Sequence, residues 1–219
     1  MRSLIGVILL VLVASPFTVA QEGLSEEQII EALRQKVQAT TPLPEAKRIE
    51  TVAQFVLRIR GRETCSFEGT LIQEGERREL RANELPAECA QFREQISTIF
   101  LSSAQISAVF LGNYAYEVIG EQVVSGDRQY KIRAQARDPK ENLHLMEVWI
   151  PWETGLIPEG LLYIRKPKTA PIRIVQTYYQ EDGRWLLRSV RASTSFYILI
   201  IIRVGVEIDI DVRSTRYSF

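Results

Sequence analysis

Histidine, serine and cysteine supply the nucleophiles and bases of most hydrolases, and this sequence has a single histidine, His144. It stands in "ENLHLMEV", at the expected start of a strand. A Ser-His-Asp or Cys-His arrangement would need its imidazole as the base. Neither cysteine lies near it in the sequence, and no G-x-S-x-G turn is present. We therefore expect a solvated or hydrogen-bonded surface histidine, and a protein that is not an enzyme.

Carboxylates at alternate positions form a second group that could do chemistry. In "EIDIDV", Glu207, Asp209 and Asp211 would share one face of a strand. Three carboxylates can bind a hard cation such as calcium. The same alternation is typical of the polar face of a half-buried strand, and we favour that interpretation. With no C-x-x-C and no second histidine, a zinc site is not indicated, and we expect neither a metal nor a cofactor.

Nucleic acid and phosphate binding are not indicated by the sequence. It has no G-x-x-x-x-G-K and no G-x-G-x-x-G loop. Its 27 lysines and arginines balance 27 aspartates and glutamates, and basic residues alternate with acidic ones. A nucleic-acid surface needs a basic patch, so we expect no nucleic-acid partner.

The first 20 residues have the layout of a secretory signal peptide. One basic residue, Arg2, precedes an apolar core, and the small residues Thr18 and Ala20 stand before a cut at Gln21. The alternative is an uncleaved anchor, but the apolar core is short for a span of about 20 residues. We predict cleavage after residue 20, export, and no transmembrane segment in the mature chain, whose length fits one domain or two small ones.

Two cysteines remain, Cys65 and Cys89. An even number of cysteines in an exported chain usually forms disulfides. The alternative is two reduced thiols, one in a strand and one on a helix.

Hydrophobic periodicity predicts one helix, a strand region, a helical region and then strands only. "LSEEQIIEALRQKV" has Ser25 and Gln28 at capping-box spacing before an apolar stripe. Alternation predicts strands at 49–59 and 65–72, and a spacing near 3.6 predicts one or two helices within 87–111. The later strands are expected at 114–124, 129–137, 144–150, 161–166, 172–180, 184–194, 196–204 and 207–219. This spacing favours one large antiparallel sheet.

The segment "FYILIII" at 196–202 has no polar face. It is too short for a transmembrane helix, and an exposed strand of this kind would aggregate. We predict that it is buried on both sides, or that it faces a cavity or a partner.

The C-terminal half carries several turn and packing motifs in order. They are "VWI" with Thr-Gly at 148–155, "DGRWL" at 182–186, "YSF" at 217–219, and "GEQVVSGDRQYKIRAQARDP" at 120–139. Together they resemble the outer-membrane lipoprotein-sorting (LolA-like) family over 114–219. Pro151 stands where an aspartate is usual and Leu187 where a proline is usual. Residues 61–112 match none of these motifs.

The resemblance implies a periplasmic protein with a single α+β domain over 21–219, in which a large antiparallel sheet curves into an unclosed β-barrel. An N-terminal helix and a central helical lid would cover its concave face, above an apolar cavity. Members carry lipoprotein acyl chains across the periplasm, or bind lipids and lipidated proteins. Our candidate cavity residues are Phe55, Leu57, Phe67 and Leu71 from the early strands and Phe92, Ile96, Phe100 and Phe110 from the helical region.

The leading hypothesis is therefore a periplasmic carrier or binder of lipid, acylated or otherwise hydrophobic ligands. The same apolar residues could instead fill a solid core. A non-catalytic envelope protein–protein interaction module, using an open sheet edge or residues 196–202, is the alternative function.

Overall fold

The computed structural model describes residues 23–40, 47–74, 77–82, 85–90, 106–141, 143–165, 170–198 and 202–218. The proposed signal peptide lies outside these ranges, so its cleavage and the domain bounds that follow from it stay predictions. Within the described ranges, no helix has both the length and the apolar character needed to cross a membrane.

Strands make up most of the described chain. The helices are α1 (Glu26–Thr40), α2 (Ala87–Ala90) and α4 (Ile106–Phe110). The strands are β1 (Arg48–Ile59), β2 (Arg62–Glu74), β3 (Arg77–Ala82), β4 (Tyr114–Val124), β5 (Asp127–Ala136), β6 (Leu143–Pro151), β7 (Glu159–Ile164), β8 (Ile172–Glu181), β9 (Arg184–Ile198) and β10 (Ile202–Ser218). The short, arginine-rich β3 was not among the strands expected from the sequence.

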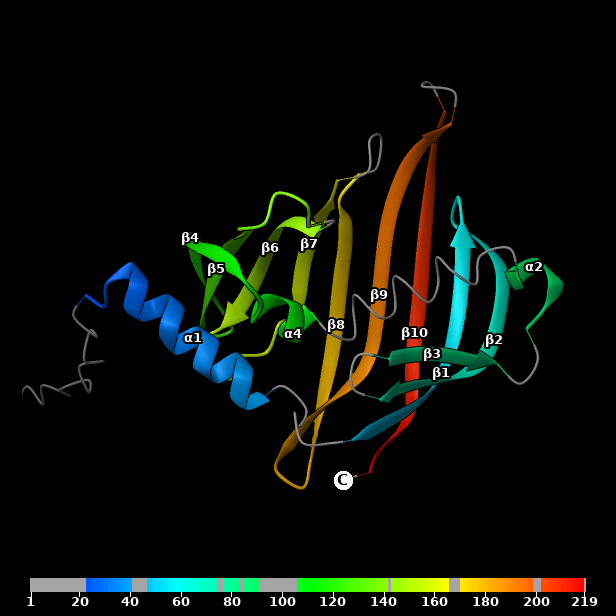
Figure 1. Cartoon of the computed structure of the whole chain (residues 1–219), viewed down its shortest axis with the longest axis horizontal. Helices are drawn as coiled ribbons and strands as arrows, with labels where there is room; N and C mark the ends of the chain where they lie inside the picture. Colours follow the sequence, from blue (N-terminus) through cyan, green and yellow to red (C-terminus); the bar gives the residue numbers. More distant parts are fainter. Residues whose placement is uncertain are drawn as a thin grey trace, which may run out of the picture.

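All ten strands belong to one antiparallel sheet in the order β3-β2-β1-β10-β9-β8-β7-β6-β5-β4. Consecutive strands are neighbours except β3 and β4, and β1 also pairs with the last strand, β10. The sheet is not closed: β3 and β4 form its edges, and residues 83–113 connect them (Figure 1). The predicted unclosed antiparallel sheet is confirmed.

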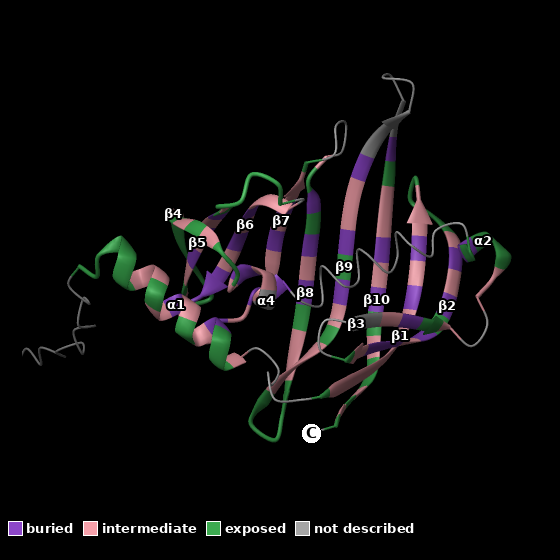
Figure 2. Ribbon diagram, viewed as in Figure 1, coloured by how far each residue is buried: buried purple, intermediate pink, exposed green. Residues whose placement is uncertain are grey.

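One face of the sheet is apolar and carries the helices. We call it the inner face, and define it by Phe55 and every side chain that the strand register places on the same side. Buried residues alternate with less buried ones along β8, β9 and β10, as a two-residue period requires (Figure 2). The opposite, outer face is the wetter side.

The helices meet the inner face at its two flanks (Figure 1). Helix α1 begins with the predicted capping box: Gln28 N–H donates to Ser25 Oγ over 3.3 Å, and Ser25 N–H to Gln28 Oε1 over 2.8 Å. Helices α1 and α4 lie beside β4–β7, whereas α2 lies beside β2. Of the predicted helical lid over 87–111, only α2 and α4 are described; residues 91–105 lie outside the described ranges.

The prediction of one strand over 196–204 and another over 207–219 is wrong. The chain reverses between Ile198 and Ile202, and β10 continues as one strand through Gly205 to Ser218. Gly205 pairs with Ser195 of β9, so this glycine does not interrupt the strand. The reversal falls among aliphatic residues and has no Asn-Gly or Pro-Gly signal, which is why periodicity missed it.

Candidate ligand-binding face

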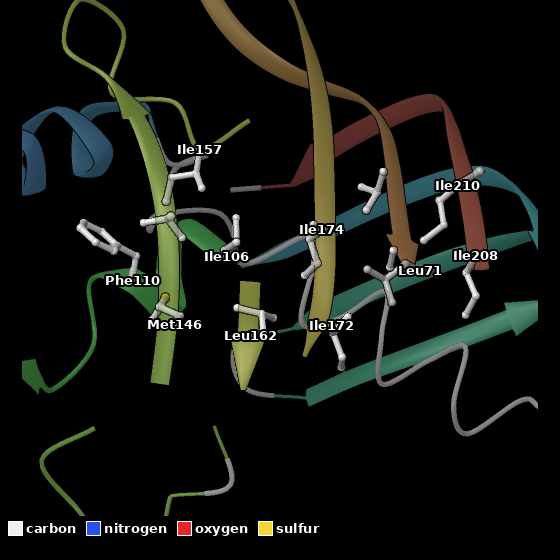
Figure 3. Packing of buried hydrophobic residues seen from close by; sticks show 14 of the residues in the cluster. Leu71, Ile106, Phe110, Met146, Ile157, Leu162, Ile172, Ile174, Ile208 and Ile210 are labelled. Carbon is white, nitrogen blue, oxygen red and sulfur yellow. The ribbon is translucent and has the colours of Figure 1, made fainter. Parts of the chain in front are cut away.

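The inner face is a continuous apolar wall. One row of directly paired residues crosses nine strands from β2 to β4: Cys65, Leu57, Ile208, Ala192, Ile174, Gly160, Val148, Ile132 and Val118. Because register fixes which side chains share a face, this row places Leu57 and Ile208, which are 151 positions apart in the chain (208 minus 57), side by side on one surface. Figure 3 shows members of this cluster from β2, β6, β7, β8 and β10 together with Ile106 of α4.

The four early-strand candidates all lie in this wall. Phe55 and Phe67 are directly paired, and their rings stack with centroids 4.9 Å apart. Leu57 and Leu71 belong to the same buried cluster. Phe110 of α4 is buried too, and its ring meets that of Tyr116 edge-on at 5.2 Å. The structure thus brings these five residues into one cluster, although whether they line a ligand cavity stays a prediction.

Three further candidates cannot be placed. Phe92, Ile96 and Phe100 lie outside the described residues. Their proposed role in a cavity therefore stays a prediction from the spacing of apolar residues alone.

A disulfide joins α2 to the wall. Cys65 of β2 is bonded to Cys89 of α2, as the sequence predicted, and both residues are buried. Since Cys65 shares the inner face with Leu57, the bond holds α2 on that face. It leaves neither cysteine as a thiolate nucleophile.

Helix α4 contacts the wall where a glycine leaves room for it. A Cβ atom on Gly160 would lie 2.6 Å from Cδ1 of Ile106 and 3.1 Å from Cγ1 of Val148. The Ile106 side chain therefore rests almost directly on the backbone of β7. Hydrogen bonds from the Tyr116 hydroxyl to the carbonyl oxygens of Phe110 and Gly112 hold the end of α4 against β4.

Helix α1 contacts the hairpin that follows β6. Gly155 has a φ of +68°, and a Cβ there would lie 2.5 Å from Cβ and 2.7 Å from the carbonyl carbon of Lys36. The Lys36 ammonium lies 4.9 Å from the centre of the Trp152 ring, a cation–π contact. At its other end, Glu26 accepts a 2.8 Å hydrogen bond from Val118 N–H on the edge strand β4. The hairpin "VWIPWETGLIP" thus serves as a docking site for α1.

Gln176 interrupts the apolar wall. Among the described residues, Gln176 and Ser195 are the only buried polar ones, and the register places Gln176 on the inner face opposite Val190. The Tyr178 hydroxyl donates to Gln176 Oε1 over 2.7 Å and lies 3.1 Å from the Ile157 carbonyl oxygen. Burial raises the pKa of Tyr178 far above its ordinary value, outweighing the hydrogen bond to Ile157.

The outer face carries ion pairs. Asp209 pairs with Arg58 and with Arg191, the latter over 2.6 Å, while Ile208 and Ile210 on either side are buried. The interpretation of "EIDIDV" as a half-buried strand is confirmed. No group of three or more metal-ligating side chains occurs in the part of the chain that the structure describes.

His144 lies at the irregular start of β6 and is half-buried. Its Nδ1 atom is buried and has no hydrogen-bond partner among the described residues. The expected solvated or hydrogen-bonded surface histidine stays a prediction.

An open hollow of about 510 Å³ lies on the other side of the sheet from this wall. Leu161, Arg173 and Ser193, which pair across β7, β8 and β9, form part of its lining. Arg173 is exposed and pairs with Glu159 over 2.8 Å. This hollow is not the apolar cavity under the helices that the sequence predicted.

Sequence reasoning missed the half of the wall that β5–β8 supply. Ile132, Met146, Ile174 and Gln176 are buried on it but were not among the candidates. The alternation of "IRIVQTYY" would have placed Ile174 and Gln176 on one face. Periodicity does not say which face is the inner one, so the signal alone was insufficient.

An unclosed antiparallel sheet with helices against one apolar face defines the structural class of this protein. No family model and no curated protein sequence matches the chain. Among solved structures it is similar to a DUF1329 family protein from Desulfovibrio piger, with 12% identity, a TM-score of 0.54, and coverage of 86% of this chain and 92% of that one. It is also similar to a LolA superfamily protein from Nitrosomonas europaea, with 8% identity, a TM-score of 0.53, and coverage of 89% and 94%. The chain has the LolA-like fold.

Proposed function

We propose that this protein is an exported, periplasmic binder or carrier of hydrophobic ligands such as the acyl chains of lipids or lipoproteins. The observation that carries the proposal is the apolar row that crosses the sheet from β2 to β4 without a charged residue. An acyl chain transferred from water to such a wall gains about 0.8 kcal/mol for each buried methylene.

Two further observations support the proposal. The disulfide between Cys65 and Cys89 fits an oxidising compartment such as the periplasm, in agreement with the predicted signal peptide. The chain also has the LolA-like fold, and the resemblance of residues 114–219 to that family implies a concave face that binds acyl chains.

A fluorescent fatty acid titrated into purified native chain 21–219 tests the proposal. We expect saturable uptake with increased fluorescence. The variant Ala192→Leu adds volume in the middle of the wall, where Ala192 is 1% exposed, and should weaken binding. The matched control is Ser193→Leu, one residue along β9 on the outer face, which should bind like the wild type. No uptake by folded wild type would refute the proposal.

The alternative is a protein–protein interaction module on the same fold. It is favoured by the open edge strand β4, where Val123 is 66% and Val124 44% exposed at the hairpin end. An unpaired strand edge can pair with a strand of another protein. Replacing Val123 with lysine should abolish co-purification of such a partner from an envelope extract and leave fatty-acid uptake unchanged.

A further inference from the structure

Strand β4 is an edge of the sheet, and helix α1 covers part of that edge. The strand has 11 residues, and β5 is its one neighbour among the described strands. The side of β4 that faces away from β5 therefore carries backbone N–H and C=O groups that an extended strand of another chain can bind. Helix α1 contacts β4 and lies beside it (Figure 1). What covers this edge thus decides whether the sheet can extend into a second chain.

Glu26, the first residue of α1, occupies one of these edge groups. Its Oε1 atom accepts a 2.8 Å hydrogen bond from Val118 N–H, so this N–H points away from β5. Further along the helix, the Arg34 guanidinium lies 5.1 Å from the centre of the Tyr116 ring. The carboxylate oxygen takes the position that a carbonyl oxygen of an added strand would need. The helix therefore lies where such a strand would have to pass Val118.

The burial pattern along β4 shows where this cover ends. Every second residue from 114 to 118 is half-buried, whereas every residue from 121 to 124 is exposed. The register between β4 and β5 shifts between Val118 and Gly120, as at a β-bulge. A bulge and a covering helix are two of the devices that keep strand edges from pairing. The part of β4 beside α1 is thus protected, and only its hairpin end is open.

We propose that α1 is an autoinhibitory guard of the β4 edge: its Glu26 carboxylate holds the Val118 N–H and keeps β4 from pairing with the β4 edge of a second copy of this chain. Antiparallel pairing of one strand with its own copy gives a closed two-fold dimer, and both copies contribute the same edge groups. When α1 leaves, the open edge grows from the hairpin end toward the whole of β4. This inference goes beyond the proposed function and does not depend on it, because it concerns the strand edge and not the apolar wall.

Substitutions in the first turn of α1 test the guard on the purified protein. Glu26→Ala removes the acceptor and should shift the mass measured by light scattering from one chain toward two. Glu27→Ala is the matched control, because it removes the same charge from the next exposed residue of the helix, and it should stay a single chain. Glu26→Gln keeps an amide oxygen that can accept the hydrogen bond and should also stay a single chain.

Amide hydrogen exchange at Val118 measures the contact itself. In the wild type the exchange should be slow at every protein concentration, because Glu26 holds the N–H. In Glu26→Ala the amide should lose this protection in dilute solution and regain it as the concentration rises, since the strand of a second copy then accepts the same N–H. A merely structural loss of the helix end would not restore protection in this way.

Two further variants keep the test independent of Glu26 itself. Gly155→Ala forces an overlap with the backbone of Lys36, so it should displace α1 from its other end and give the same dimer, whereas Gly183→Ala should not. Adding Val123→Lys to Glu26→Ala should suppress the dimer, because a lysine on an open strand edge disfavours pairing. Circular dichroism on each variant establishes that it is folded.

The outcomes either support the guard or overturn it. A folded Glu26→Ala protein that stays a single chain, with Val118 unprotected at high concentration, would overturn it. A wild type that is already a dimer, or a dimer that forms equally in Glu27→Ala or persists with Val123→Lys, would do the same. The fatty-acid titration is a separate measurement on the wild type, so failure of the guard and failure of the proposed function are distinguishable.

Discussion

Replacing Gly155 with alanine should displace α1 from the hairpin on which it packs. Gly155 has a φ of +68°, in the left-handed region, and the added Cβ would lie 2.7 Å from the carbonyl carbon of Lys36. Backbone cannot move aside as the end of a side chain can, so the helix must shift. Helix α1 buries Leu33 and Val37 completely, and fully burying each such side chain is worth about 1.5–3 kcal/mol.

Gly183 provides a matched control for the backbone strain alone. Its φ is +74°, and a Cβ there would meet nothing within 4 Å. Gly183→Ala should therefore cost only the left-handed strain, about 1–2 kcal/mol. Gly155→Ala should cost that amount plus about 1–3 kcal/mol for the forced overlap with Lys36. The difference between the two variants isolates the contact between the hairpin and α1.

Urea unfolding of the two variants and the wild type measures both free energies. Limited proteolysis with trypsin adds a local measurement, because Arg34 and Lys36 lie on α1 and should be cut faster once the helix is displaced. Equal destabilisation by Gly155→Ala and Gly183→Ala, with unchanged cleavage at these residues, would refute the docking of α1 on the hairpin.

Three other predictions concern the wall and the outer face. Cys89→Ser opens a covalent loop with a sequence separation of 24 and should lower the free energy of unfolding by about 3 kcal/mol. In a urea titration, a reductant should destabilise the wild type by a similar amount and leave the variant unaffected. Phe55→Ala should cost about 3–5 kcal/mol in the same titration, and a loss below 1 kcal/mol would show that its ring does not pack as described. Although burial raises the pKa of Glu147, hydrogen bonds from Lys131 and Arg133 outweigh it and hold that pKa below its ordinary value. The ionised Glu147 carboxylate therefore stabilises the folded protein above the unfolded pKa of about 4.3, and this stabilisation is lost as the pH falls through the folded pKa. The loss of unfolding free energy caused by Glu147→Gln should accordingly shrink below about pH 4. A loss that stays constant with pH would contradict the lowered pKa of Glu147.

The local signals in the sequence were sufficient for the elements that form from neighbouring residues. The capping box at Ser25 and Gln28, the alternation of β1 and the wet and dry faces of "EIDIDV" all agree with the structure. Each depends on contacts within one helix turn or on the two-residue period of one strand. The pair Cys65–Cys89 also followed from the sequence, because an exported chain with two cysteines has one possible intramolecular bond.

The chain reversal between Ile198 and Ile202 and the strand β3 did not follow from the sequence. The reversal lies among residues that favour strands on both sides of it, and β3 is rich in arginine rather than in apolar residues. In both cases pairing with a neighbouring strand decides the structure, and a neighbour is not visible in a local pattern.

The sequence by itself therefore determined most of the strands, which residues of a strand share a face, and that the chain carries more apolar surface than it can leave in water. Only the tertiary structure decided that β1 pairs with β10, and through that pairing that Phe67, Phe55 and Gln176 belong to one row. The physical reason is that the register between strands distant in the chain is fixed by packing over the whole inner face, and no stretch of sequence contains that information alone.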